Sequence, residues 1–324
     1  MTRPHLVLTR RWPASVEAEL ALRYDVELNE DDQPMDAPAL RSAMQRADAL
    51  CPTVTDNIDA DVIGVGEPGA RLIASFGVGF NHIDLEAAVE QGVAVTNTPD
   101  VLTDCTADLT IALMLMCARR AGEGERELRA GRWAGWRPTH LTGTRVTGKT
   151  LGIIGMGRIG QAVARRAVHG FGMRLLCYNR SPVAPEVLEA FDARQVSDVD
   201  QVLASADFVS LHCPANEDTH HLIDARGLAL MPDHAHLVNT ARGNVVDEAA
   251  LSQALRDGAI RGAGLDVYER EPYLHEGLLA LDNVVLLPHL GSATIESRTA
   301  MGMRVLHNLD AFFAGEALPD GVVG

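Results

Sequence analysis

Residues 149–180 read KTLGIIGMGRIGQAVARRAVHGFGMRLLCYNR, and the rest of the chain can be interpreted outward from them. The apolar run at 151–154 has the length and composition of a buried strand. Apolar residues recur at helical spacing across 159–167, and Phe171-Gly172 ends that pattern before a second apolar run at 175–178. These residues predict a strand–helix–strand unit.

Three glycines, Gly155, Gly157 and Gly160, form the pattern G-x-G-x-x-G at the first turn of this unit. The first glycine permits a tight turn, the second lets the backbone approach a pyrophosphate, and the third lets the helix pack closely on the strand. Unpaired N–H groups at the helix N-terminus are suited to bind that pyrophosphate. Because a strand precedes the glycines and a helix follows them, the sequence favours a dinucleotide site over a merely structural turn.

The end of the second strand bears on the choice of cofactor. NAD-binding units usually place an acidic residue about 20 residues after the glycines, where it holds the ribose 2′-hydroxyl. This chain has Asn179 there, followed by Arg180 and Ser181. Asparagine does not repel a 2′-phosphate, and Arg180 offers several donors to one, although it could also be a solvated loop charge. The sequence therefore favours NADP(H), with NAD(H) as the alternative.

Length, charge and cysteine content limit the possible classes. A chain of 324 residues, 47% hydrophobic, predicts two domains. The formal net charge of −16 argues against a nucleic-acid partner. Five cysteines without a C-x-x-C pattern indicate small buried residues in a reducing compartment. We found no secretory signal or membrane-length apolar run, and therefore expect a soluble, cytoplasmic protein without membrane contacts.

The first hundred residues alternate short apolar strands with helical patterns, which predicts parallel strands covered by helices on both faces. A long apolar helix is expected at 103–120, either in a core or at a subunit contact. The loop at 131–148 contains Trp133 and Trp136, which suggest a partner surface or else cover their own domain. Glu17 and the charges at 123–127 are expected on solvated faces.

Four further strands are predicted at 208–211, 236–239, 262–265 and 284–287. Each is followed by distinctive polar residues, and ligands of open parallel sheets bind at the carboxyl ends of the strands. We therefore expect the residues that follow these strands to meet at one edge. They are His212-Cys213-Pro214, Thr240-Ala241-Arg242-Gly243, Asp266 with Glu269 and Glu271, and Pro288-His289.

With these residues identified, the chain resembles the D-isomer-specific 2-hydroxyacid dehydrogenases, above all their glyoxylate/hydroxypyruvate reductases. The resemblance runs nearly from end to end. It is carried by the GMGRIG turn, the HCP of 212–214, and the segments ASFGVGFNHIDLEAA (74–88), TNTPDVLTDCTADLTIALML (96–115), NTARGNVVDEAAL (239–251), GAGLDVYEREP (262–272) and LPHLGSAT (287–294).

The resemblance implies a role for individual residues. His289 corresponds to the acid/base histidine, Glu271 to its carboxylate partner and Arg242 to the substrate arginine. The backbone of Val78 and Gly79 corresponds to a cradle for the substrate carboxylate, which Arg242 and His289 also contact. The cofactor-binding residues are expected to be Thr106, Gly155, Gly157, Arg158, Ile159, Gly160, Asn179, Arg180, Ser181, His212, Cys213, Pro214, Thr240, Asp266 and Gly291. An extra residue near 168–170 blurs the alignment of Asn179 by one position.

These residue types suit the reduction of a 2-keto acid, in which carbon 2 gains a hydride and its oxygen gains a proton. Arg242 can orient the carboxylate and polarise the carbonyl by two-point hydrogen bonding, although a strand-end arginine is often a surface ion pair. His289 can donate the proton near neutral pH, and Glu271 would favour its charged form. Asp266 could orient this pair or the cofactor carboxamide, or be structural. We see no metal-ligand spacing.

The resulting expectation is an α/β protein of two doubly wound parallel-sheet domains. Residues 1–100 and 290–324 form a flavodoxin-like substrate domain, and 101–289 a Rossmann cofactor domain, with hinge closure over a cleft. The expected activity is NADPH-dependent reduction of glyoxylate or hydroxypyruvate to a D-2-hydroxy acid, in a homodimer. Alternatives are a reductase of bulkier acids such as phenylpyruvate or 2-ketogluconate, an NAD-dependent phosphoglycerate dehydrogenase-like enzyme, and a non-catalytic NAD(H)-sensing corepressor. Formate dehydrogenase is disfavoured, because it would carry a glutamine in place of Glu271.

Overall fold

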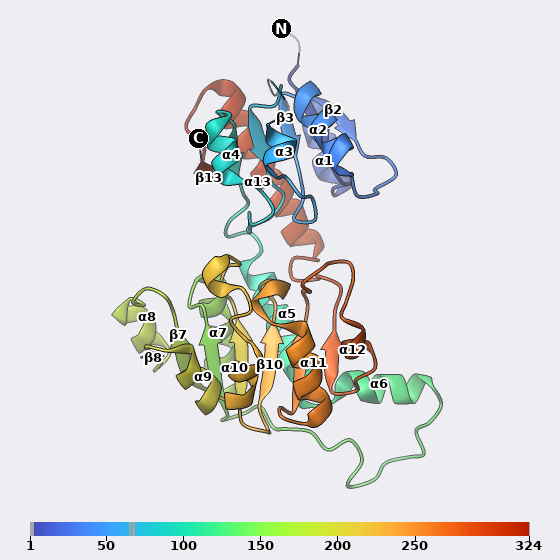
Figure 1. Ribbon diagram of the computed structural model, residues 1–324, viewed down its shortest axis with the longest axis vertical. Coiled ribbons are helices and arrows are strands. Elements are labelled where there is room, and N and C mark those ends of the chain that lie inside the picture. Colours follow the sequence, from blue (N-terminus) through green and yellow to red (C-terminus); the bar gives the residue numbers. More distant parts are fainter. Residues whose placement is uncertain (1–2, 65, 67–68, 324) are drawn as a thin grey trace. The chain divides into compact units, whose positions relative to one another are not determined.

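The computed structural model describes residues 3–64, 66 and 69–323. The chain folds into two compact units, each built around its own sheet (Figure 1). Unit 1 combines Met1–Leu102 with Ala293–Gly324, and unit 2 is the continuous stretch Thr103–Ser292. The expectation of two parallel-sheet α/β domains is confirmed.

Unit 1 contains a six-stranded sheet in the order β13-β5-β4-β3-β1-β2. Its five N-terminal strands are parallel, and their order 2-1-3-4-5 is that of flavodoxin-like sheets. The strands are β1 (His5–Leu8), β2 (Asp25–Leu28), β3 (Ala49–Cys51), β4 (Leu72–Ala74), β5 (Ala94–Thr96) and β13 (Gly321–Val323). The helices are α1 (Ala14–Arg23), α2 (Ala37–Arg46), α3 (Ala60–Ile63), α4 (Leu85–Glu90) and α13 (Ile295–Ala314).

Alternation along the strands of unit 1 fills two cores, one on each face of the sheet. Val7 of β1 packs into a cluster with residues of α2, α3 and α4, whereas its neighbours Leu6 and Leu8 pack with residues of α1 and α13. One expectation fails here, and one strand was not predicted. Glu17 is buried, since its carboxylate accepts hydrogen bonds from Arg11 and from the backbone of Trp12. Strand β13 was not predicted; it pairs antiparallel with β5.

Unit 2 contains a seven-stranded parallel sheet in the order β12-β11-β10-β9-β6-β7-β8. Counted from β6, this is the Rossmann order 3-2-1-4-5-6 with one further strand. The strands are β6 (Thr150–Ile154), β7 (Arg174–Tyr178), β8 (Arg194–Val196), β9 (Phe208–Leu211), β10 (His236–Asn239), β11 (Gly262–Leu265) and β12 (Val284–Leu286). The helices are α5 (Thr103–Ala118), α6 (Ala121–Arg129), α7 (Arg158–Phe171), α8 (Pro185–Ala190), α9 (Val199–Ser205), α10 (Ala225–Leu230), α11 (Glu248–Asp257) and α12 (Glu276–Leu279), with 3-10 turns at Glu217–Thr219 and Gly243–Val245.

The long segment after α6 carries no helix or strand, as the loop prediction for 131–148 anticipated. Trp133 is 52% exposed and Trp136 is 82% exposed, so most of the Trp136 side chain faces solvent. Helix α6 itself contributes no buried residue. Among the described residues, no helix is long and apolar enough to cross a membrane.

Candidate active site

The glycine-rich turn lies where the strand order of unit 2 reverses. Strand β6 pairs with β7 on one side and with β9 on the other, so the loops after β6 and β9 diverge at this point. Gly155 follows β6 with φ +99°, and a Cβ there would lie 2.6 Å from the backbone N of Cys213. Only glycine fits this close approach in this backbone conformation.

The other two glycines fit the roles that a dinucleotide requires. A Cβ on Gly160 would lie 2.3 Å from the carbonyl oxygen of Gly155, so a side chain would push α7 off the sheet. A Cβ on Gly157 would meet nothing within 4 Å. Gly157 is the N-cap residue of α7, so this open space faces the helix N-terminus, and no side-chain cap occupies it. Backbone N–H groups and the helix dipole can therefore bind a pyrophosphate between Gly157 and Ile159.

The residue that ends β7 lies beside this turn. Asn179 Oδ1 accepts a hydrogen bond from the backbone N of Met156 at 3.1 Å, and its Nδ2 donates to the carbonyl of Ser181 at 2.9 Å. Arg180 is exposed next to them. The tertiary structure thus places Asn179 at the end of the strand next to the glycines, although the sequence near 168–170 blurred its alignment. Those three residues lie within α7.

The residues after β9 form the opposite wall of the turn. A 2.8 Å hydrogen bond joins His212 Nε2 to Ser210 Oγ. Burial lowers the pKa of His212 to about 3. Burial also raises the pKa of the Cys213 thiol to about 11. Both side chains are therefore uncharged at neutral pH, and they suit contact with a cofactor better than acid–base chemistry. The carbonyl of Pro214 is held by Thr219 Oγ1 at 2.7 Å.

Arg242 lies in the turn that follows β10. Asn239 shapes this turn by accepting from the backbone N of Ala241 at 3.0 Å and donating to the Arg242 carbonyl at 2.9 Å. Burial lowers the pKa of the Arg242 guanidinium below its ordinary value, and the nearby Glu271 carboxylate acts in the opposite direction. Since arginine starts far above neutrality, the group stays charged. A half-buried cation next to a carboxylate is thus available at this edge.

Glu271 and His289, 18 residues apart in sequence, meet at the same edge. His289 Nδ1 lies 2.8 Å from Glu271 Oε2, and Glu271 Oε1 accepts from the backbone N of Tyr268 at 3.0 Å. Burial raises the pKa of Glu271, but the contacts with His289, Tyr268 and Arg242 outweigh it, so the net pKa is lowered. An ionised carboxylate only accepts, so Nδ1 carries the hydrogen and Nε2 is the nitrogen left to transfer a proton.

Asp266 fixes the turn that presents His289. Its carboxylate accepts from the backbone N of Leu290 at 2.7 Å and of Gly291 at 2.8 Å, while its carbonyl accepts from the backbone N of His289 at 2.9 Å. His289 has φ +53°, a strained conformation that these three bonds stabilise. Burial raises the pKa of Asp266, against the effect of the two N–H groups and His289. Of the roles considered for Asp266, the structure favours orientation of the His289 turn.

Helix α5 contributes threonines to this edge. Thr106 Oγ1 donates to the Gly291 carbonyl at 3.1 Å, and Thr110 Oγ1 lies 2.8 Å from Thr240 Oγ1. Thr110 was not predicted, although it stands one helical turn after Thr106 on the same face. Arg158 begins α7, and Ile159 packs against the core of unit 2.

Val78 and Gly79 follow β4 in unit 1, so the structure of unit 2 does not bear on their role. The carbonyl of Val78 accepts from Asn97 Nδ2 at 2.7 Å. Within the described part of the chain, no hydrogen bond occupies the N–H of either residue. Their backbone donors suit an anion, and binding of the substrate carboxylate there stays a prediction.

Comparison with known proteins identifies the family of this chain. Residues 111–291 match the family model of the D-isomer specific 2-hydroxyacid dehydrogenase, NAD binding domain. The chain belongs to the D-isomer specific 2-hydroxyacid dehydrogenases. The resemblance of its motifs to this family is thereby confirmed, and the matched range falls within unit 2.

Relatives of this dehydrogenase span its full length. A glyoxylate reductase of Thermococcus litoralis is 44% identical over 98% of this chain and 96% of its own. A putative family member from Polaromonas has a TM-score of 0.92 at 36% identity, covering 99% of this chain and all of its own. An NADPH-dependent glyoxylate/hydroxypyruvate reductase of Sinorhizobium meliloti, solved with NADP and malonate, has a TM-score of 0.88 at 32% identity, covering 99% and 97%.

Family membership fixes the class of activity. The protein is a nicotinamide-dinucleotide-dependent oxidoreductase that acts on a small acid. Among the described residues, no group of three histidine, cysteine or acidic side chains is arranged to hold a metal ion.

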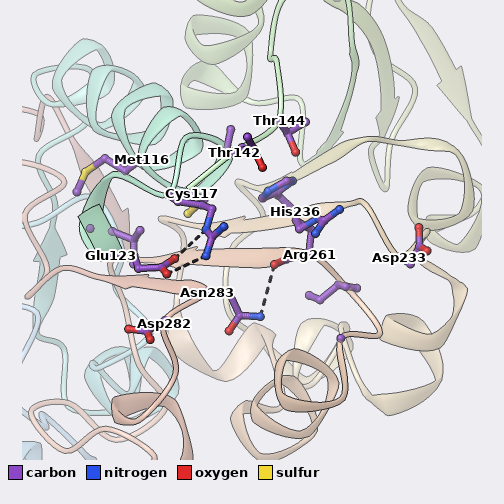
Figure 2. Close-up of a pocket in the computed structure, with 17 residues that line it drawn as sticks. Met116, Cys117, Glu123, Thr142, Thr144, Asp233, His236, Arg261, Asp282 and Asn283 are labelled. Carbon is purple, nitrogen blue, oxygen red and sulfur yellow. Dashed lines mark hydrogen bonds and ion pairs between the residues drawn. The ribbon is translucent and has the colours of Figure 1, made fainter. Parts of the chain in front are cut away.

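A separate cavity of about 380 Å³ lies at the amino ends of β10, β11 and β12 (Figure 2). None of the predicted site residues lines it. Glu123, labelled in Figure 2, lines this cavity, and its carboxylate accepts hydrogen bonds from Arg120 Nε and Nη2, each at 2.8 Å. His236 stacks on Phe208 there, and burial lowers its pKa to about 4, which leaves the ring neutral. This cavity opens at the end of the strands away from the glycine-rich turn.

Proposed function

We propose that this dehydrogenase reduces glyoxylate, hydroxypyruvate or a similarly small 2-keto acid, with NADPH as the preferred donor. The observation that carries the proposal is the 2.8 Å contact between His289 and Glu271, at the strand edge that also holds Arg242 and the glycine-rich turn. The glyoxylate reductases among its relatives support the substrate class. Hydroxypyruvate would give a D-2-hydroxy acid, and glyoxylate gives glycolate.

Each residue of the site has a defined task. When bound, the reduced nicotinamide supplies the hydride that forms the new C–H bond at carbon 2. Arg242 binds the substrate carboxylate and draws electron density toward the carbonyl oxygen. Protonated His289 donates from Nε2 to that oxygen, which forms the O–H bond and leaves a neutral ring. Glu271 stabilises the charged ring before transfer and holds its orientation afterwards. Val78 and Gly79 are proposed to bind the carboxylate through their N–H groups.

Absorbance of the reduced cofactor provides the direct test of this activity. We expect purified protein to oxidise NADPH with glyoxylate and hydroxypyruvate faster than with phenylpyruvate or 2-ketogluconate. A preference for the two larger acids would favour the bulkier-substrate alternative. No turnover with any of the four would contradict the proposed substrate class and would favour the corepressor-like alternative.

The preference for NADPH depends on the residues after β7. Asn179 introduces no negative charge beside the ribose, and exposed Arg180 can pair with a 2′-phosphate. We expect Arg180→Ala to raise the KM for NADPH about 10-fold, which is the effect of losing one charge-assisted hydrogen bond. The KM for NADH should be unchanged, because NADH has no 2′-phosphate. Arg174→Ala, at the other end of the same strand, is the matched control. Equal effects on both cofactors would contradict this role for Arg180.

We extend the proposal to a homodimer. Trp133 and Trp136 expose large apolar side chains in one loop, and the preceding helix α6 buries none of its residues within the monomer. Exposed aromatic side chains of this kind are enriched at protein interfaces.

A further inference from the structure

A second histidine–carboxylate contact lies close to the proposed site but takes no part in the chemistry above. His221 Nε2 lies 3.0 Å from Oε1 of Glu269, a residue two positions before Glu271 in the chain. The backbone N of His221 donates to the Asn244 carbonyl at 2.8 Å, in the turn after Arg242. His221 lies in the loop that follows Cys213-Pro214. It therefore links this loop to the turn after Arg242 and to the segment that carries Glu271.

Glu269 is also joined to a buried glutamate in a reciprocal arrangement. Glu269 Oε1 accepts from the backbone N of Glu248 at 2.9 Å, and Glu248 Oε1 accepts from the backbone N of Glu269 at 2.8 Å. The other oxygen of Glu248 accepts from the backbone N of His275 at 3.2 Å. Glu248 is only 5% exposed, and burial raises its pKa. The Glu248 carboxylate thus holds the backbone at Glu269 and at His275, one before and one after Glu271 in the chain.

The same segment is pressed against the Arg242 turn. A Cβ on Gly243 would lie 1.8 Å from the backbone carbon of Tyr268 and 2.3 Å from the N of Glu269. The Tyr268 N–H in turn donates to Glu271. A shift of Glu269 therefore also moves the Tyr268 N–H and the main chain up to Glu271, because packed segments move together. Both position the Glu271 carboxylate.

We propose that His221, Glu248 and Glu269, here called the Glu269 brace, are positioning residues that hold Glu271 in contact with His289. The brace rests on the proposed function, since it acts through two residues of that site. It contacts neither carbon 2 nor the carbonyl oxygen in the proposed reaction. Its effect is to keep Glu271 within hydrogen-bonding reach of the ring, where a displacement of about 1 Å can cost on the order of 10²-fold in rate.

The matched variants are His221→Phe and His220→Phe. The two rings stack on each other with centroids 4.1 Å apart, so each substitution keeps an aromatic ring in place, and only the first removes the bond to Glu269. We expect His221→Phe to lower kcat on the order of 10-fold with little change in the KM for cofactor, and His220→Phe to change neither. Glu269→Gln keeps the acceptor oxygen and should retain more activity than Glu269→Ala.

A double-mutant cycle separates positioning from a general structural effect. If the brace acts through Glu271, His221→Phe should add less than about a twofold loss in the Glu271→Gln background, because the shared partner is already changed. A full loss of about 10-fold in that background would overturn the proposal. In the wild-type background, His221→Phe should also move the fall of kcat at alkaline pH to lower pH, because a displaced Glu271 no longer stabilises the charged ring. An unchanged pH profile would overturn it as well.

A readout without turnover keeps the brace testable apart from the reaction. In nuclear magnetic resonance, the Nδ1–H proton signal of His289 should move upfield in His221→Phe, because its 2.8 Å hydrogen bond to Glu271 lengthens, and an unchanged signal would overturn the proposal. The same variant set should be compared for this signal because several charged groups lie nearby: Asp247, Glu248, Glu269 and His275 around the brace, and Asp266, Glu271 and Arg242 around His289. If the wild-type enzyme shows no turnover but the Nδ1–H signal still moves in His221→Phe, only the proposed function is contradicted.

Discussion

Two histidine–carboxylate pairs lie at opposite ends of the sheet in unit 2, and they differ in what surrounds them. At the amino end, His234 Nε2 lies 3.0 Å from Asp207 Oδ1; at the carboxyl end, His289 Nδ1 lies 2.8 Å from Glu271 Oε2. The distances are nearly equal. Asp207, however, also accepts from Lys149 Nζ at 3.0 Å and from the backbone N of Thr150 at 2.8 Å. Its bonding capacity is used to join the starts of β6 and β9.

The pair at the carboxyl end has the surroundings that the proposed chemistry requires. Arg242 lies beside it, the strained φ of His289 is held by Asp266, and the glycine-rich turn opens at the same edge. The amino end has the cavity of about 380 Å³, yet its Arg120 is already paired with Glu123 and its Asp282 with Arg126. A histidine beside a carboxylate, or a hollow in the surface, is thus poor evidence of a site unless the strand ends converge on it.

The largest difference is expected when each histidine is removed. His289→Gln should lower kcat/KM about 10³-fold, within the range for loss of a general acid, because the proposed proton donor is removed. His234→Gln should leave kcat/KM within about twofold, since surface changes away from the site are nearly neutral. Steady-state kinetics with glyoxylate measure both. A comparable loss in the two variants would remove the distinction between the two ends.

A smaller effect is expected when arginines are shortened to lysine. Arg242→Lys keeps the charge but loses the planar two-point contact, so kcat/KM should fall about 10²-fold, mostly through a higher KM for the keto acid. Arg261→Lys, in the wall of the amino-end cavity, should leave both parameters unchanged. If Arg261→Lys impaired reduction and Arg242→Lys stayed active, the substrate site would lie at the amino end of the sheet, and the proposed site would be contradicted.

The smallest effect on activity, and a clear effect on stability, is expected for Asp207→Asn. Burial raises the pKa of Asp207, but the contacts with Thr150, Lys149 and His234 outweigh it, so its folded-state pKa lies below the ordinary value of about 3.9. Its stabilisation is therefore complete above that pH and is lost as pH falls through the folded-state pKa. Asp207→Asn should lower the unfolding free energy at pH 7 by about 1–3 kcal/mol and flatten its decline in acid. Denaturant unfolding at several pH values measures this, and a wild-type pH dependence in the variant would contradict it.

Much of unit 2 was predictable because its signals are local. Strand–turn–helix patterns, the spacing of Gly155, Gly157 and Gly160, and the apolar strands at 208–211, 236–239 and 262–265 depend on neighbours in the chain. Three elements gave no local signal. Strand β8 (Arg194–Val196) has one apolar residue, strand β13 (Gly321–Val323) begins with a glycine, and α6 has no buried apolar face to give a helical pattern. Glu17 was misjudged because its burial depends on Arg11, which the helical pattern does not include.

The sequence by itself determined the class of fold, the glycine-rich turn and the identity of Arg242, Glu271 and His289 as candidates, because period, turn chemistry and strand ends are written in consecutive residues. Only the tertiary structure decided that Glu271 Oε2 bonds His289 Nδ1, that Asp266 holds the strained turn, and that His221 and Glu248 converge on Glu269. Those contacts join residues that lie between 18 and 48 positions apart. Their geometry depends on the order and register of parallel strands, which no local pattern specifies.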